Sequence, residues 1–183
     1  MPEAGSAAGL TGIFLRAGLR HALIGGHGVN AWITPRETDD YDFIVGPDRD
    51  AIEAVEQALR AVGLRHLRRQ DGGEPSGPDF SQMSNESRSF KIDFQVAKTD
   101  YQMLVLDRAR QSETSAFNVA TPEDLVVLKL LAMRSQDQRD IALMVDLLGS
   151  RLDWEYIEHW AQVWDVLPAL RVFRPAPGDE TAS

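Results

Sequence analysis

The chain has 183 residues, of which 43% are hydrophobic, and a formal net charge of -9 at pH 7. This length and apolar content suit one globular domain with a substantial core and require no second domain. The acidic balance argues against a basic nucleic-acid-binding surface over the whole molecule, although the arginines between positions 60 and 69 form a local basic cluster.

Two absences in the sequence bear on where the protein works. There is no cysteine, so disulfides and thiolate chemistry are excluded and a cytosolic location is compatible. The first ten residues lack the basic start and long apolar stretch of a signal peptide, and no later run approaches a membrane span. We therefore expect a soluble, cytoplasmic protein that does not enter a membrane.

The first predicted elements surround a pair of glycines. Residues 8–18 have apolar side chains at helical spacing, and residues 21–24 form an apolar strand that runs into Gly25 and Gly26. Residues 27–33 follow as a short helix. Glycines between a strand and a helix let backbone N–H groups approach a polyphosphate. This turn is therefore a candidate phosphate-binding element.

The next strand carries two acidic residues. Side chains alternate between faces along residues 40–45, so Asp40 and Asp42 point the same way while Tyr41, Phe43 and Val45 point into a core. Neighbouring carboxylates repel each other unless a cation or a proton lies between them. Oxygen ligands of this kind suit Mg²⁺ or Mn²⁺. The simpler alternative is an acidic turn that enters an edge strand.

A helix, a short strand and a loop are predicted next. Asp48 is a suitable N-cap for an amphipathic helix over residues 49–62 that covers the sheet. Residues 64–67 form a short strand, and the arginines beyond it are interpreted as a solvated edge. Residues 70–79 are rich in glycine, proline and charge without periodicity, which predicts a mobile loop.

A third acidic residue lies on a strongly alternating strand. Along residues 90–96, apolar and polar side chains alternate strictly, which predicts a strand with one buried face and places Asp93 on the other face. If this strand lies beside that of Asp40 and Asp42, the three carboxylates converge as in a two-metal phosphoryl-transfer site. The alternative for Asp93 is a solvated polar position.

The C-terminal third is predicted to be mostly helical. A helix over residues 100–109 and a short strand at 117–120 precede Thr121, which is the N-cap of a helix with proline at its first position. That helix is apolar nearly all round and should be buried, so its Lys129 must either reach solvent or meet an anion. Two further helices are predicted, the last with tryptophans on its core face.

Several motifs together resemble a known superfamily. Ile24-Gly25-Gly26, thirteen residues and then Asp40-x-Asp42 resemble the signature of nucleotidyltransferases with a DNA polymerase β-like palm. Arg36-x-Thr38 before these acids is similar to the version in small bacterial nucleotidyltransferases, notably the abortive-infection toxin group. The resemblance covers roughly residues 10–165.

The resemblance implies a fold class. It is α/β (α+β), with a nucleotidyltransferase palm-like mixed β-sheet, packed helices and a C-terminal helical portion. On this basis residues 1–120 form the core and residues 121–173 a helical part of the same domain. Residues 174–183, rich in proline, glycine and acid, are predicted to be a disordered tail.

The resemblance also implies roles for individual residues. Asp40 and Asp42 would hold Mg²⁺ or Mn²⁺, and Asp93 would complete the triad as a metal ligand and as the base near the attacking hydroxyl. A set of residues would contact the nucleotide, ATP or another nucleoside triphosphate: Gly25, Gly26, Arg36, Thr38 and Lys129. Gly26 departs from the serine that many members carry at this position.

The implied activity is transfer of a nucleoside monophosphate from a nucleoside triphosphate to a hydroxyl group. The acceptor would be tRNA or a partner protein, as in toxin–antitoxin systems, with an antitoxin as a further partner. The same motifs also resemble aminoglycoside and lincosamide nucleotidyltransferases, whose acceptors are small hydroxylated molecules. A third alternative is a nucleotide-binding regulatory protein without catalysis.

Overall fold

The computed structural model describes residues 7–33, 35–70 and 79–174. Its contacts divide the chain into two compact units, Met1–Ala120 and Thr121–Ser183. That the second unit belongs to the same domain as the first stays a prediction. Most of the loop expected at 70–79, and the tail expected from 174 apart from its first residue, lie outside the described residues.

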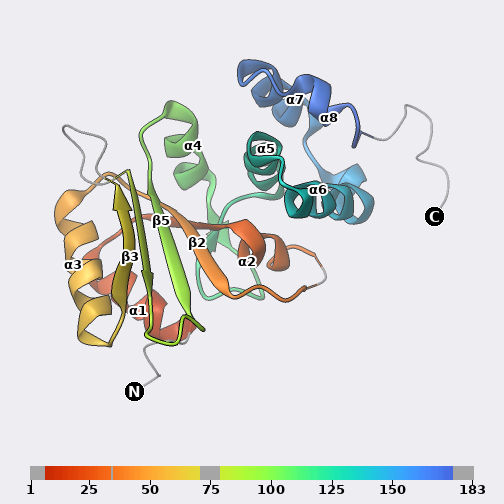
Figure 1. Cartoon of the computed structure of the whole chain (residues 1–183). Coiled ribbons are helices and arrows are strands. Elements are labelled where there is room, and N and C mark those ends of the chain that lie inside the picture. The colour runs from red at the N-terminus through yellow and green to blue at the C-terminus, as the bar shows by residue number, and fades with distance from the viewer. Residues whose placement is uncertain (1–6, 34, 71–78, 175–183) are drawn as a thin grey trace. The chain divides into compact units, whose positions relative to one another are not determined.

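Among the described residues, the first unit contains a seven-stranded mixed sheet with the order β3-β4-β5-β2-β1-β7-β6 (Figure 1). β2 and β5 run parallel at its centre, as do β1 and β7, and the other neighbouring strands are antiparallel. The strands are β1 (His21–Ile24), β2 (Asp40–Val45), β3 (Arg65–Gln70), β4 (Phe80–Ser84), β5 (Lys91–Val96), β6 (Arg110–Gln111) and β7 (Asn118–Val119).

Helices of the first unit provide one wall of its core. α1 and α3 pack side by side, and their buried residues join a single apolar cluster with the inward side chains of the sheet (Figure 1). Asp48 caps α3 by accepting a hydrogen bond from the backbone N–H of Ala51, as predicted. The helices are α1 (Ala7–Ala17), α2 (Gly25–Asn30), α3 (Arg49–Ala61) and α4 (Asp100–Arg108).

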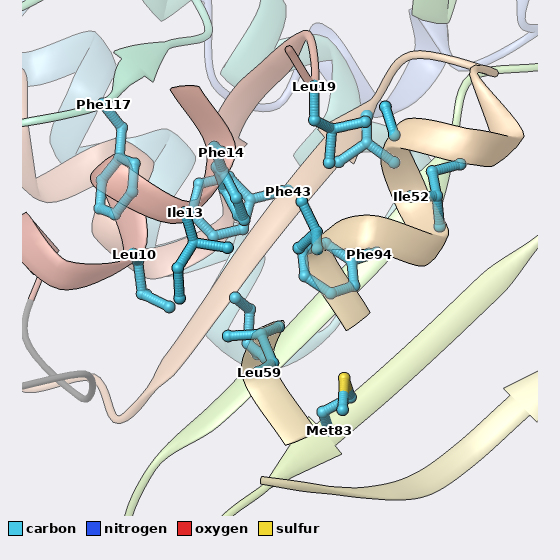
Figure 2. Packing of buried hydrophobic residues seen from close by; sticks show 14 of the residues in the cluster. Leu10, Ile13, Phe14, Leu19, Phe43, Ile52, Leu59, Met83, Phe94 and Phe117 are labelled. Carbon is cyan, nitrogen blue, oxygen red and sulfur yellow. The ribbon is translucent and has the colours of Figure 1, made fainter. Parts of the chain in front are cut away.

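Aromatic rings from two strands and a helix meet at the centre of this core (Figure 2). Phe14 of α1 meets Phe43 of β2 edge to face at 5.0 Å between ring centroids, and Phe94 of β5 stacks on Phe43 at 6.3 Å. All three side chains are fully buried. Because alternate strand residues face opposite ways, this packing turns the neighbouring acidic residues to the other face of the sheet.

Two strands escaped prediction, and a third is longer than expected. β4 and β6 were not predicted, because β4 has serines at buried positions on both faces and β6 has only two residues. β3 begins at Arg65 and extends through the arginines that were expected beyond the strand. Its pairing with β4, and not its own hydrophobicity, holds this edge strand in place.

Some helical boundaries and faces also differ from prediction. α2 begins at Gly25 and ends at Asn30, where residues 27–33 were expected. Val62 lies outside α3 and is 43% exposed. α4 ends at Arg108, where a helix to residue 109 was expected, and it buries Tyr101, Val105 and Leu106.

The second unit is helical throughout its described residues. Thr121 caps α5 by accepting a hydrogen bond from the backbone N–H of Asp124, as predicted. α5 ends at Ala132, because Met133 adopts the left-handed conformation with φ of 48°. In α7 the buried residues are Ile157 and Ala161. The tryptophans expected in the core are partly exposed at 154 and 160 and exposed at 164. The elements are α5 (Pro122–Ala132), α6 (Ser135–Leu148), a 3₁₀ turn (Gly149–Arg151), α7 (Trp154–Val163) and α8 (Leu167–Leu170).

None of the helices in the described ranges combines the length and the apolar composition that crossing a bilayer requires.

Candidate active site

The central strands bring two of the predicted acids side by side. β2 and β5 are parallel neighbours, and in their register Asp42 lies opposite Asp93 while Asp40 lies opposite Lys91. Register partners point to the same face of a sheet. The condition set for convergence, that these two strands are neighbours, is therefore met, and the carboxylates share the face opposite the aromatic core. We call this side of the sheet the carboxylate face.

Asp40 is engaged by a lysine of the neighbouring strand. The Lys91 Nζ atom lies 3.0 Å from Oδ1 and 3.3 Å from Oδ2 of Asp40. The hydrogen bond and charge of Asp40 raise the pKa of Lys91, so the ammonium form is favoured. Lys91 therefore neutralises one carboxylate of the site and limits the repulsion between Asp40 and the acids beside it.

The two carboxylate oxygens of Asp93 differ in their hydrogen bonding. The Gln82 side-chain amide of β4 donates to Oδ2 at 2.9 Å, whereas Oδ1 is buried and has no hydrogen-bond partner among the described residues. Burial raises the pKa of Asp93, against the opposing effect of the Gln82 hydrogen bond. A buried acceptor without a donor is rare in folded proteins. Oδ1 is thus the atom of this site that is available to a metal ion or a proton.

The raised pKa of Asp93 predicts that the free energy of unfolding depends on pH. Because its pKa is raised in the folded protein, Asp93 destabilises the fold as pH rises from the ordinary value of 3.8 through the raised value. The D93N variant lacks this titrating carboxyl group and otherwise has the same ionisable groups. We expect the free energy of unfolding of wild type to fall relative to D93N over this interval, measured by urea denaturation in metal-free buffer. A constant difference across the interval would contradict the assignment.

The glycine pair packs directly against the other site residues. Gly25 has φ of +61°, and a β-carbon at this position would overlap the Asp42 carboxylate, with Cγ at 2.7 Å. A β-carbon on Gly26 would lie 2.6 Å from Thr38 Oγ1 and 3.1 Å from a terminal nitrogen of Arg36. The structure therefore brings Gly25, Gly26, Arg36, Thr38 and Asp42 into one cluster. Absence of a side chain at both glycines is a condition of that cluster.

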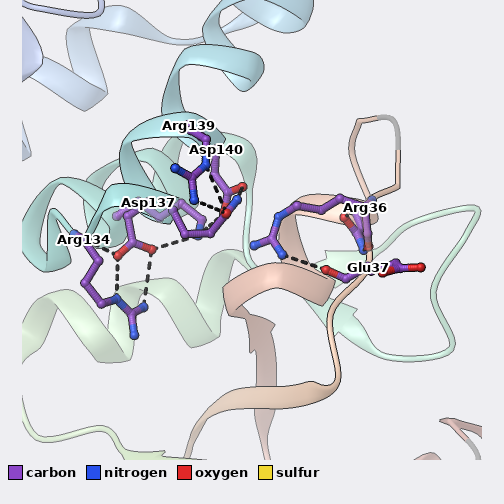
Figure 3. A network of polar contacts seen from close by, with 9 residues as sticks. Arg36, Glu37, Arg134, Asp137, Arg139 and Asp140 are labelled. Atoms are coloured by element: carbon purple, nitrogen blue, oxygen red, sulfur yellow. Dashed lines mark hydrogen bonds and ion pairs between the residues drawn. The ribbon is translucent and has the colours of Figure 1, made fainter.

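The segment before β2 is held by hydrogen bonds and by a ring stack. The Asn30 side chain donates to the Arg36 carbonyl at 2.7 Å and accepts from the Arg36 N–H at 3.0 Å. The Arg36 guanidinium donates to the Glu37 carbonyl at 3.0 Å (Figure 3). His27 stacks on Tyr41 with 4.1 Å between ring centroids, and burial lowers the pKa of His27. The Asn30 and Glu37 hydrogen bonds therefore fix the position of the Arg36 backbone and the direction of its side chain.

Substitution of Gly25 tests the cluster. Gly25→Ala introduces a residue into the left-handed region, which costs about 1–2 kcal/mol, and also pushes on Asp42. Gly18→Ala is the matched control, because Gly18 has φ of +66° and open space around it. We expect G25A to weaken Mg²⁺-dependent nucleotide binding in a calorimetric titration, while G18A lowers stability alone. Equal nucleotide binding by the two variants would contradict the expectation.

Lys129, in the second unit, meets carboxylates of its own chain. Its side chain is buried, and Nζ lies 2.6 Å from Asp140 Oδ2 and 3.1 Å from Asp137 Oδ1. Arg134 adds a bond from Nε to Asp137 at 2.7 Å (Figure 3). Although burial opposes it, these hydrogen bonds lower the pKa of Asp137. Of the two alternatives for Lys129, the structure shows an anion partner; contact with a nucleotide stays a prediction.

The residues of the carboxylate face suit a divalent metal ion in their chemistry. Asp42 and Asp93 supply carboxylate oxygens at adjacent positions. Oδ1 of Asp93 has no hydrogen-bond partner among the described residues and is therefore open to a metal ion. Within the described residues, no three His, Cys, Asp or Glu side chains lie close enough to form a metal site as they stand. The fit therefore rests on the Asp42–Asp93 pair, and Asp40 would join it when Lys91 moves away.

Comparison with known proteins identifies the fold. No family model matches the chain, and no curated protein matches it. The antibiotic-resistance factor ANT(2″)-Ia in solution aligns with a TM-score of 0.57 and 13% identity, over 93% of this chain and 96% of that chain. The same factor in complex with adenylyl-2″-tobramycin aligns with a TM-score of 0.53 and 15% identity, over 89% and 95%.

A candidate nucleotidyltransferase from H. pylori is also similar, with a TM-score of 0.52 and 12% identity over 94% of this chain and 82% of that chain. At such identities the likeness concerns the fold. The chain has the mixed α/β architecture of these nucleotidyltransferase structures, so the predicted fold class is confirmed. Membership of the abortive-infection toxin group stays a prediction.

Proposed function

We propose that this protein is a metal-dependent nucleotidyltransferase that moves a nucleoside monophosphate from a nucleoside triphosphate to a hydroxyl acceptor. The observation that carries the proposal is the pairing of Asp42 with Asp93 across β2 and β5, with the Gly25 backbone packed against the Asp42 carboxylate. The fold shared with ANT(2″)-Ia supports it. An acidic pair beside glycines at the start of a helix suits a phosphoryl-transfer site.

The three acids would bind the metal ion, and one of them would also act as the general base. Asp40 and Asp42 would hold Mg²⁺ or Mn²⁺ together with Asp93. When bound, the metal supplies stabilisation of the charge that develops on the entering and leaving oxygens. The acceptor oxygen attacks the α-phosphorus, the bond to the bridging oxygen breaks, and pyrophosphate leaves. Asp93 would also take the proton of the acceptor hydroxyl as the general base.

The glycine cluster would bind the triphosphate. Backbone N–H groups at Gly25 and Gly26 can approach phosphate oxygens because no side chain intervenes. Arg36 and Thr38 lie against Gly26 and would add a guanidinium and a hydroxyl donor. Lys129 is proposed as a further phosphate contact because the family resemblance implies it, and this role requires it to exchange a carboxylate partner for the nucleotide.

Two acceptor classes follow from different observations. The motif resemblance to toxin-type enzymes supports tRNA or a partner protein, with an antitoxin as the regulatory partner. The structural likeness to ANT(2″)-Ia, solved with adenylyl-2″-tobramycin, supports an aminoglycoside, and the net charge of -9 suits a cationic drug. A nucleotide-binding regulatory protein would keep the cluster and transfer nothing.

A labelling screen tests the activity and identifies the acceptor. The protein is incubated with Mg²⁺ and each α-labelled nucleoside triphosphate in the presence of separate tRNA, total-protein and aminoglycoside pools, and the label is followed into each pool. We expect label in one pool with release of pyrophosphate. Label in none, after a screen of divalent metals, would overturn the proposed transfer and favour the binding protein.

A further inference from the structure

A single row of side chains crosses four strands on the carboxylate face. Asp42 is the register partner of Asp93, Asp93 of Gln82, and Gln82 of Arg68. A bulge between His66 and Arg68 shifts the register of β3 by one residue, which turns Arg68 toward this face. The row therefore runs from the proposed metal ligands, through the amide that holds Asp93, to an arginine at the sheet edge.

The arginines of β3 are sorted by face and by partner. On the opposite face, Arg69 lies 3.0 Å from the buried carboxylate of Glu56. Arg65 donates to the carbonyls of Arg60 and Leu64 at 3.3 and 2.9 Å. Arg68 is exposed, and its guanidinium has no hydrogen-bond or ion-pair partner in the part of the chain that the structure describes. Structure-stabilising contacts therefore account for Arg65 and Arg69 but leave Arg68 unexplained.

Position within the row gives Arg68 a defined neighbourhood. Adjacent strands lie about 4.8 Å apart, so the backbones of Arg68 and Asp93, two strands apart, are separated by about 10 Å. With its long side chain extended, the Arg68 guanidinium can come within the length of one nucleotide of the Asp93 carboxylate. Acids lie at one end of the row and a guanidinium at the other. In the proposed function, Asp93 is beside the acceptor hydroxyl, so Arg68 lies on the acceptor side of the site and away from the glycine cluster.

We propose that Arg68 is an acceptor-binding residue that takes a backbone phosphate of a polynucleotide whose 3′ hydroxyl is directed at Asp93. This inference rests on the proposed function for the place of the acceptor. A guanidinium matches the geometry of a phosphate and binds it through paired N–H donors. A cationic aminoglycoside at the same place would be repelled by Arg68. The row thus selects an anionic acceptor even though the net charge of the chain is -9.

Binding without catalysis tests this proposal separately from transfer. The probe is a fluorescein-labelled RNA hairpin with a four-nucleotide single-stranded 3′ end, titrated with the full chain in EDTA without nucleotide and followed by fluorescence anisotropy. The variants are R68E, R68K and the control R49E. Arg49 is an exposed arginine of α3, the helix that covers the other face, so R49E makes the same change of charge elsewhere.

We expect R68E to weaken RNA binding at least about tenfold and R49E to leave it nearly unchanged. R68E should also lower the slope of log affinity against log salt by about 1, because one phosphate contact is lost. R68K should bind with intermediate affinity. Circular dichroism confirms that each variant is folded.

Three results would overturn the assignment. Equal weakening by R68E and R49E would show charge attraction without a site. Unchanged binding by R68E would show that Arg68 does not contact RNA. Binding of tobramycin, with no RNA binding by wild type, would assign the acceptor side to a cationic drug. Because the titration needs neither metal nor nucleotide, transfer that fails in the labelling screen leaves this result interpretable.

Discussion

Asp42→Asn is expected to reduce nucleotidyl transfer by about a thousandfold or more, with nucleotide binding that no longer responds to Mg²⁺. The amide has nearly the shape of the carboxylate, so packing against Gly25 is retained. It lacks the charge that would hold a divalent ion between β2 and β5. The loss is therefore chemical and not structural. Single-turnover transfer with labelled triphosphate and calorimetric titration with and without Mg²⁺ measure the two effects.

The matched control for this variant is Asp39→Asn. Asp39 directly precedes β2 and is exposed, so the change of charge is the same and occurs only one residue before the strand. We expect D39N to keep both activities within a few fold of wild type. Equal losses in D39N and D42N, or Mg²⁺-dependent binding that survives in D42N, would show that Asp42 is not the metal ligand that the proposed function requires.

Lys129→Met is expected to lower the free energy of unfolding by about 3–5 kcal/mol, because it removes the cation that neutralises a buried carboxylate. Asp140 is 2% exposed and lies 2.6 Å from Lys129, and in the variant it keeps the Gln136 hydrogen bond but loses this cation. Asp137 keeps the Arg134 cation. The main cost therefore arises at Asp140. Urea denaturation followed by circular dichroism measures it.

A second substitution separates charge from packing at this position. In K129M/D140L both charges are removed together, and we expect most of the lost stability to return, since apolar replacements of a buried ion pair are often neutral. Arg139→Met is the control, because Arg139 is an exposed cation of α6 that bonds only to Gln136 among the described residues. If K129M were no more destabilising than R139M, the buried ion pair would not hold the helices together.

Lys129 also shows where a motif and a structure answer different questions. The family resemblance implies that the lysine contacts a nucleotide, and in the structure its ammonium contacts two carboxylates on α6. Nucleotide titration of K129M/D140L, the variant expected to regain stability, separates these roles. Unchanged affinity in that variant would leave Lys129 with the structural role, and a large loss would support the phosphate contact.

The local patterns of the sequence were sufficient for several parts of the site. Strict alternation along β2 and β5 placed Asp40, Asp42 and Asp93 on the face opposite the core, because the side-chain period of a strand is two. Thr121 followed by proline located the start of α5, since capping depends on a few neighbouring residues. The glycine pair located the end of β1, although α2 already begins at Gly25 where a turn was expected.

Other parts depended on strand pairing, which a local pattern does not encode. Gln82 was not predicted because β4 has serines at buried positions and shows no apolar alternation, so only its pairing with β5 reveals that it holds Asp93. The partner of Lys91 likewise became visible only in the register with β2.

Arg68 shows most clearly what tertiary structure decided. By parity with its neighbours in β3 it belongs on the face of His66, and the bulge between them places it on the other face. One residue of slippage exchanges the two faces of a strand, and hydrogen bonding to the next strand sets that slippage. The sequence by itself determined which acids share a face; the pairing of strands determined which side chains stand beside them.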